Sequence, residues 1–370
     1  MKVTLFKAFP DPYRQSMTVY ADQLMRSFRA VLLPTEEVTG YLPGQLLLAP
    51  RVARYWSQYV EYQLRAHFAQ GDINHVIDHS FGHLVYSLDA RRTVVTFHDA
   101  TVSKLANGTI SGNGISKKTI LSLRYSLAAI QKAAAVIADS EISRKDFIHL
   151  TAGDPERVHV VYPGVDLSFR VLEDREALKA RYGLKGQHIL HVGHNLFYMN
   201  VEGVLKVLHH LVSRMGVDVK LLKVGIPLTD AQNKLVSDLQ LQDRIVFLGR
   251  VAAEDLPAVY NCADVLLYPV LYAGFGFPPL EAMACGTPVV CSNRGSLPEI
   301  VGDAAIMTDP QDHQQMAAHV AALLSDGGLR DAYLAKGLQQ ARHYTWEKAA
   351  KEILGIYRKV YDSSPPGNAR

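Results

Sequence analysis

The chain has 370 residues, of which 48% are hydrophobic and 20% are charged, and its formal net charge is +3. This length suits two domains, and the composition is that of a globular protein rather than a disordered one. The near-neutral charge and the absence of a recognition motif argue against nucleic-acid binding. The sequence contains no run of about 18 apolar residues, so we expect no membrane span.

The N-terminus and the cysteines indicate the compartment. Met1–Phe9 reads as a first strand and not as a signal peptide, because it lacks a long apolar stretch and a small-residue cleavage site. Cys262, Cys285 and Cys291 show no metal-ligand spacing, so we expect reduced, semi-buried thiols. The protein is therefore expected to be cytoplasmic.

Short β-branched runs in the N-terminal half predict strands separated by helices. The expected strands are Val3–Ala8, His75–Asp78, Val94–His98, Ala135–Ala138 and Val158–Tyr162. Met17–Ala30 predicts a helix after the first strand. Ser16, just before it, either caps this helix or presents its N–H to a ligand.

The stretch Arg51–Arg65 mixes arginines and aromatics at helical spacing, with Tyr55, Tyr59 and Tyr62 on one face. We favour a helix packed on its own sheet with its arginines extended towards water. Peripheral contact with the inner membrane is the less favoured alternative.

Two strand ends in this half carry polar residues. His98 ends an apolar strand, and ligands of open α/β sheets bind beyond such ends; a hydrogen bond from His98 to a loop is the alternative. Asp99 is predicted to be a turn residue. In the next strand–helix pair, Ser143 is the expected N-cap, with Asp146 approximating a capping box, and Ser140 is a second site candidate.

The C-terminal half has the regular alternation of a parallel, doubly wound sheet. Its expected strands are His188–Val192, Val219–Val224, Arg244–Leu248, Asp264–Tyr268, Val289–Ser292 and Ala305–Thr308. Trp346–Tyr361 predicts a final amphipathic helix. The Pro/Gly-rich residues 363–370 predict a disordered tail.

A glycine-rich turn follows the strand Asp264–Tyr268. Gly274 and Gly276 allow the backbone to approach a ligand closely. Pro278 and Pro279 fit the first positions of a short helix, and Gly286 fits the left-handed cap after it. The free N–H groups at such a helix start suit a phosphate or diphosphate.

This segment resembles the donor-binding signature of the retaining glycosyltransferases of family 4, in which two glutamates lie eight positions apart around Gly-Phe-Gly. The chain matches at Gly274, Phe275, Gly276 and Glu281, and has Ala273 at the place of the first glutamate. Further likeness extends from about Val94 to the C-terminus. The resemblance implies a GT-B fold, with two Rossmann-like domains, a deep interdomain cleft and a final helix that crosses back to the first domain.

The resemblance also implies domain boundaries and an activity. It places an acceptor domain at 1–168, a donor domain at 169–345 and the crossing helix at 346–362. It implies transfer of a hexose from a UDP-sugar or GDP-mannose to a glycan or lipid-linked acceptor hydroxyl, with retention, in surface polysaccharide or glycolipid biosynthesis. No cofactor beyond the nucleotide-sugar substrate and no metal are expected.

Site roles carried over from the family fall on both halves of the chain. Glu281 would hold the ribose, and His98 would meet the sugar at the anomeric centre. Backbone N–H groups of Gly276, Phe277 and Leu280 would line the diphosphate and sugar. The remaining donor candidates are Gly274, Phe275, Gly193, His194, Asn195, Asn200, Arg250, Val251 and Ser16.

The loop after His188–Val192 departs from the family as well. Gly193 and Asn200 match, but His194 or Asn195 stands at the position of an arginine and Met199 at that of a lysine. Two cations that neutralise the diphosphate are thereby lost. The alternatives are accordingly a weakened or inactive GT-B protein that binds nucleotide sugars or acts as a scaffold, and another GT-B enzyme such as an epimerase or phosphorylase.

Overall fold

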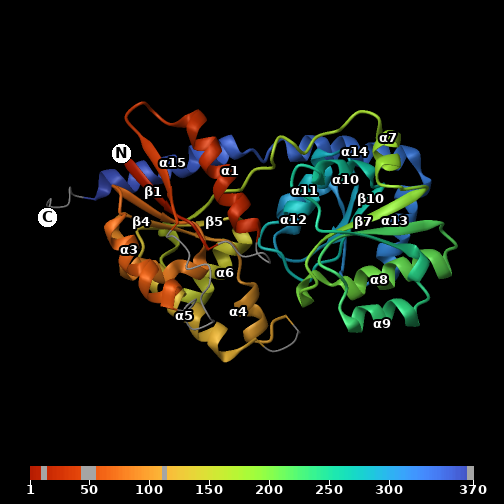
Figure 1. Ribbon diagram of the computed structural model, residues 1–370, viewed down its shortest axis with the longest axis horizontal. Helices are drawn as coiled ribbons and strands as arrows, with labels where there is room; N and C mark the ends of the chain where they lie inside the picture. The colour runs from red at the N-terminus through yellow and green to blue at the C-terminus, as the bar shows by residue number, and fades with distance from the viewer. Residues whose placement is uncertain (10–14, 43–55, 111–114, 365–370) are drawn as a thin grey trace. The chain divides into compact units, whose positions relative to one another are not determined.

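The protein is represented by a computed structural model that describes residues 1–9, 15–42, 56–110 and 115–364 (Figure 1). Contacts within the chain divide it into two compact units. The first comprises residues 1–109, 114–164 and 345–370, and the second comprises residues 110–113 and 165–344. In sequence, most of the second unit is therefore inserted between two parts of the first.

The first unit is built on a six-stranded parallel sheet in the order β2-β1-β3-β4-β5-β6. Its strands are β1 (Lys2–Phe6), β2 (Glu37–Tyr41), β3 (Ile73–Val76), β4 (Thr93–Phe97), β5 (Ala135–Ala138) and β6 (Val158–Val160). Its helices are α1 (Gln15–Val31), η1 (Ser57–Glu61), α3 (Tyr62–Phe68), η2 (His79–Tyr86), η3 (Ala90–Arg92), α4 (Thr101–Ala106), α5 (Lys117–Ile130), α6 (Glu141–Thr151), η4 (Pro155–Arg157) and α15 (Trp346–Ser363). In Figure 1, α1 and α15 lie together on one face of this sheet, with α3 and α5 on the other.

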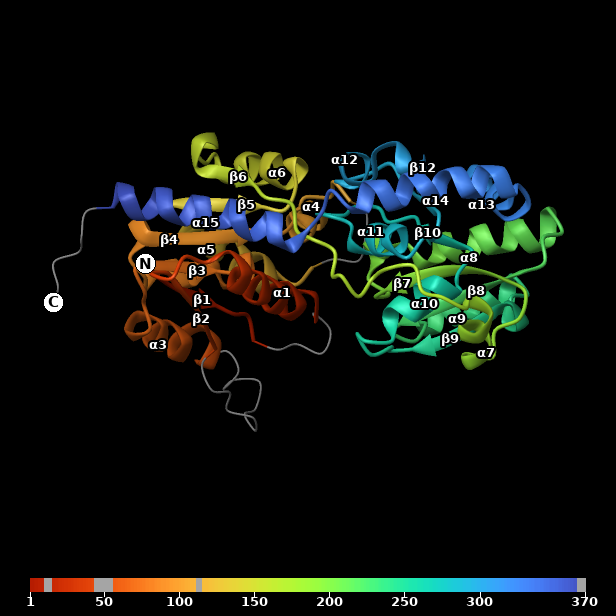
Figure 2. The ribbon, with the colours of Figure 1, turned by 90° about the horizontal axis from the view of Figure 1, so that it is seen from above.

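The second unit has a parallel sheet of the same size, in the order β12-β11-β10-β7-β8-β9. Its strands are β7 (Gln187–Gly193), β8 (Val219–Gly225), β9 (Ile245–Gly249), β10 (Val265–Tyr268), β11 (Val289–Ser292) and β12 (Ile306–Thr308). Its helices are α7 (Arg175–Arg181), η5 (Phe197–Met199), α8 (Val201–His209), η6 (His210–Arg214), α9 (Asp230–Asp238), η7 (Gln242–Arg244), α10 (Leu256–Cys262), α11 (Phe277–Ala284), α12 (Leu297–Val301), η8 (Gly302–Ala304), α13 (His313–Ser325) and α14 (Gly327–Ala341). Figure 2 shows α8 and α13 packed beside its strands.

The predicted Rossmann-like architecture is confirmed, since both sheets are parallel and their central strands are buried on both faces. The strand β2 was not predicted. Its five residues are half-exposed and include Gly40, and β2 lies at the edge of the sheet. A strand with so little apolar alternation gives no period-2 signal.

The final helix α15 packs on the first unit, as predicted. The Tyr357 hydroxyl lies 2.5 Å from Nδ1 of buried His75, and Arg358 forms a bidentate ion pair with Glu36. Burial lowers the pKa of His75 to about 3, so this imidazole is neutral. The helix runs to Ser363, two residues beyond the prediction; residues 365–370 of the predicted tail lie outside the described part of the chain.

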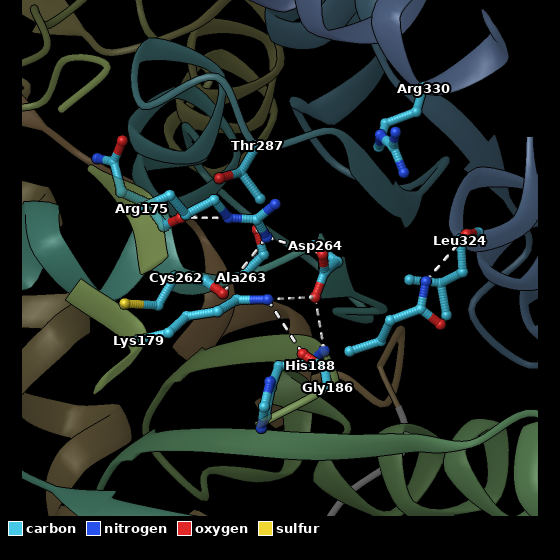
Figure 3. A network of polar contacts seen from close by, with 12 residues as sticks. Arg175, Lys179, Gly186, His188, Cys262, Ala263, Asp264, Thr287, Leu324 and Arg330 are labelled. Carbon is cyan, nitrogen blue, oxygen red and sulfur yellow. Dashed lines mark hydrogen bonds and ion pairs between the residues drawn. The ribbon is translucent and has the colours of Figure 1, made fainter. Parts of the chain in front are cut away.

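A buried carboxylate organises the amino end of the second sheet (Figure 3). Asp264 accepts hydrogen bonds of 2.7 Å from Arg175 and from the backbone N–H of His188. The Lys179 ammonium lies 3.6 Å from the same carboxylate and donates to the Gly186 carbonyl. The network joins α7 to the starts of β7 and β10.

The helix predicted around Arg51–Arg65 is described only from Trp56 onwards, so Tyr55 lies outside the described residues. Tyr62 is fully buried and donates to the Lys7 carbonyl at 2.7 Å. Tyr59 packs its ring against His83 at 4.6 Å. Both tyrosines thus contact their own unit. In the described residues no helix combines the length and apolarity needed to cross a bilayer.

Candidate functional site

The glycine-rich turn after β10 is held closed by one serine. The Ser296 N–H donates to the Ala273 carbonyl at 3.0 Å, and its hydroxyl donates to the carbonyls of Ala273 and Phe275. Gly276 has φ 122°, and a Cβ there would lie 2.8 Å from Leu297. Glycine is therefore required at the start of α11, as predicted from the motif.

Helix α11 begins with the two prolines at its first turn, as predicted, and Gly286 adopts the left-handed conformation after it, with φ 73°. Because Pro278 and Pro279 have no N–H, Gly276 and Phe277 supply the free donors at the helix start. The Leu280 N–H is the first that bonds within the helix, and the Leu280 side chain is fully buried. The prediction that these donors bind a diphosphate stays a prediction.

Glu281 lies one turn into α11 and accepts a 2.6 Å hydrogen bond from the hydroxyl of buried Tyr260. Burial raises the pKa of Glu281 to about 7, because the low-dielectric surroundings disfavour the carboxylate. The hydrogen bond from Tyr260 acts in the opposite direction. Additional hydroxyl donors from a ligand would favour the ionised form, so Glu281 is suited to accept hydrogen bonds from a ribose.

The loop after β7 follows Gly193, which has φ 145° and where a Cβ would clash with the Met199 methyl group, so the missing side chain leaves room for Met199. Asn200 has φ 53° and caps α8 through the N–H of Gly203. Its amide nitrogen donates to two proline carbonyls, Pro269 at 2.9 Å and Pro310 at 3.1 Å. The Asn200 side chain therefore joins this loop to the end of β10, a structural task that fully occupies its amide.

The other donor candidates of this unit differ in exposure. Asn195 donates to the carbonyls of Ile226 and Pro227, and His194 and Val251 are half-buried. Arg250 is exposed after β9. The structure does not describe the side chain of the first-unit candidate Ser16.

In the first unit, His98 lies at the end of β4 with both imidazole nitrogens engaged. Its Nδ1 lies 2.6 Å from Asp139, and its Nε2 lies 2.7 Å from the Ile77 carbonyl. Burial opposes the charged form, but the Asp139 carboxylate outweighs burial and raises the pKa of His98 to about 9. Both imidazole nitrogens thus have partners within the unit, which is compatible with the alternative interpretation of His98 as a hydrogen-bonding residue at the strand end. The role of His98 at the donor sugar stays a prediction.

Sequence reasoning missed the neighbouring histidine, His79. Its ring lies 6.0 Å from that of His98, and it lines a cavity of about 190 Å³ together with Asp78, Ser80, Phe9 and other residues of the first unit. Aromatic walls with convergent polar groups are typical of small-ligand sites. The rule used for His98 would have found His79, since Asp78-His79 also follow a buried strand.

The cap of α6 differs from the prediction. Ser140, not Ser143, accepts the first-turn N–H bond, because only Asp139 and Ser140 separate β5 from the helix. The Ser143 hydroxyl instead donates to the His98 carbonyl at 2.9 Å. Asp99 accepts from the Thr101 N–H at 2.7 Å, as expected of a turn residue.

Two Rossmann-like units, one of them with a glycine turn that leads into a helix start beside a half-buried glutamate, define a glycosyltransferase of the GT-B fold. Residues 174–340 match the family described as Glycosyl transferases group 1, and residues 8–169 match Glycosyltransferase Family 4. The chain is 31% identical over 273 residues to O-antigen chain mannosyltransferase B of Escherichia coli. The aligned region covers 72% of this chain and 70% of the relative. The chain therefore belongs to the family 4, group 1 glycosyltransferases.

Other relatives and solved structures agree with this assignment. A D-inositol 3-phosphate glycosyltransferase of Salinispora tropica is 30% identical over 248 residues, which are 62% of this chain and 51% of that relative. Sucrose-phosphate synthase from Thermosynechococcus elongatus superposes with a TM-score of 0.79 at 20% identity, over 98% of this chain and 100% of that one. HepE from Anabaena, solved in complex with UDP-glucose, superposes with a TM-score of 0.78 at 19% identity, over 97% of this chain and 100% of that one. At these identities the two structures establish the fold.

Proposed function

We propose that the chain transfers a hexose from a nucleoside-diphosphate sugar, a UDP-sugar or GDP-mannose, to the hydroxyl of a glycan or lipid-linked acceptor, with retention. The observation that carries this is the pair Glu281–Tyr260, one turn inside a helix whose start offers N–H groups to an anion. A mannosyltransferase and a UDP-glucose complex among the similar proteins support the two donor classes.

In this reaction the acceptor oxygen bonds to the anomeric carbon as the bond from that carbon to the diphosphate oxygen breaks. The acceptor proton passes to the departing phosphate. Glu281 holds the ribose, and the N–H groups of Gly276 and Phe277 stabilise the charge that develops on the leaving group. No covalent intermediate on the protein is needed.

Donor binding is tested by calorimetry with UDP, GDP and the sugars of both nucleotides. Glu281→Ala is expected to weaken binding about 100-fold, because a half-buried, charged hydrogen-bond acceptor for the nucleotide is lost. Glu254→Ala, an exposed carboxylate after β9, is the matched control and should leave binding unchanged. Silence of the wild type with all common nucleotides would refute the proposal.

The acceptor is proposed to bind in the cavity of the first unit, against His79. His79→Gln should raise the acceptor KM at least about tenfold while the donor Kd stays constant. His67→Gln, an exposed histidine on α3, serves as control. An unchanged acceptor KM would show that the cavity does not bind the acceptor.

A second candidate function is nucleotide-sugar binding with weak or no transfer. It is favoured by the small Ala273 and by the apolar Met199 over Gly193. Ala273→Glu separates the two: a large gain in transfer marks the natural protein as a weakened enzyme, whereas loss of transfer means that the small residue accommodates its particular donor.

A further inference from the structure

Lys223 lies near the carboxyl end of β8, and its side chain is completely buried. Its Nζ donates hydrogen bonds of 2.9 Å to the carbonyls of Gly193 and Val224. Gly193 is the last residue of β7, and the candidate donor loop follows it directly. The lysine on one strand thus fixes the start of the candidate donor loop on the next.

This ammonium has no counter-charge among the residues that the structure describes. Throughout the described ranges, no carboxylate forms an ion pair with Lys223, and burial alone lowers its pKa, to about 8. His191, its partner in the strand register, is neutral, since burial and then the Lys223 charge lower its pKa to about 3. A buried charge without a partner is costly, and the fold retains it here.

Polar atoms beside this charge lack partners as well. His191 Nε2 and Asn195 Oδ1 are buried and form no hydrogen bond with any described residue. Both belong to β7 or to its loop. Unsatisfied buried groups are rare in folded proteins, and their concentration on one strand and loop points to a ligand that the loop accommodates.

We propose that Lys223 is a positioning residue for the donor diphosphate, holding the Gly193 turn and supplying positive charge beneath it. The proposal rests on the proposed function. It explains how the loop tolerates Met199 at a position where the family has lysine: the charge comes from the neighbouring strand instead. The ammonium acts through the backbone and through space, because its side chain is closed to solvent.

The test compares Lys223→Met and Lys223→Ile with the wild type. Binding of UDP, UMP, GDP and GMP is measured by calorimetry, and thermal unfolding is followed without nucleotide. Lys220→Met, an exposed lysine on the same strand, is the matched control. Lys223→Arg, which keeps the charge, is the rescue variant.

We expect both apolar variants to bind the nucleoside diphosphate that the wild type binds about tenfold or more weakly. Their affinity for the corresponding monophosphate should fall by less than about threefold. Their Tm should equal or exceed that of the wild type, because replacing an uncompensated buried charge with an apolar group is often stabilising. Lys223→Arg should bind more tightly than either.

Four results would overturn the proposal. Unchanged diphosphate affinity in the apolar variants would show that the Lys223 charge does not contribute to diphosphate binding. Equal losses for di- and monophosphates, or unfolding of both apolar variants, make Lys223 a structural residue. A wild type that binds no nucleotide overturns the proposed function too, so the two failures are distinguishable.

Discussion

At the amino end of the second sheet, the Asp264 carboxylate lies among Arg175 and Lys179, whereas at the carboxyl end the Lys223 ammonium contacts two carbonyls and, among the residues that the structure describes, no acid. Both charges are buried. The first is compensated within the fold and holds α7 against the strand starts. The second keeps its charge available to a ligand, at the end where open α/β sheets bind substrates.

The largest effect is expected from breaking the compensated end. Asp264→Ala should lower the free energy of unfolding by about 3 kcal/mol, because Lys179 and, in part, Arg175 lose their counter-charge. Urea denaturation measures this directly. The nucleotide affinity of the folded fraction should not change; if it falls, the two ends of the sheet are coupled and the contrast is wrong.

The His98–Asp139 pair extends the contrast to the first unit. The raised pKa of His98 contributes stability that is complete below its unfolded value of 6.5 and is lost as pH rises through about 9. Asp139→Asn should therefore cost about 2 kcal/mol at pH 6.5 and less at pH 10. Unfolding curves at both pH values check the sign. An effect independent of pH would mean that the imidazole is not charged.

Glu281 extends the comparison at the ligand end, because among the described residues no basic side chain forms an ion pair with it either. Its pKa of about 7 lies above the unfolded value of 4.5, so the ionised group destabilises the fold as pH rises through this window. Glu281→Gln should gain about 1 kcal/mol at pH 8 and nothing at pH 4. Thermal unfolding at the two pH values measures it; destabilisation at pH 8 would contradict a strained carboxylate.

The smallest effect calibrates the others. Arg294 and Asp309 form an ion pair of 2.6 Å with both side chains about half exposed. Asp309→Ala should change stability by less than about 0.5 kcal/mol, since solvent and salt screen such pairs. The same urea series provides the value. A loss comparable to that of Asp264→Ala would show that exposure does not separate these pairs.

The strands and the glycine turn were predictable because their signals are local. Proline at the start of α11 and glycine after it fix its ends whatever the rest of the chain does. Long-range bonds were not predictable. Nothing near His98 in sequence reveals that Asp139 and Ile77 would occupy its nitrogens, and Lys223 reads as one polar residue in an apolar strand. The residues of the edge strand β2 are exposed or half-buried, so its sequence carries no alternation of apolar and polar residues from which a strand could be predicted.

The insertion of the second unit sets an order on synthesis. Helix α15 covers one side of the first unit, where Tyr20 packs on Trp346 and Phe28 on Tyr357, with ring centroids 5.2 and 5.9 Å apart. These partners are made only after residues 165–344 are complete. On the ribosome, the part of the protein made first is finished last, and its uncovered aromatic face is exposed to chaperones for most of that time.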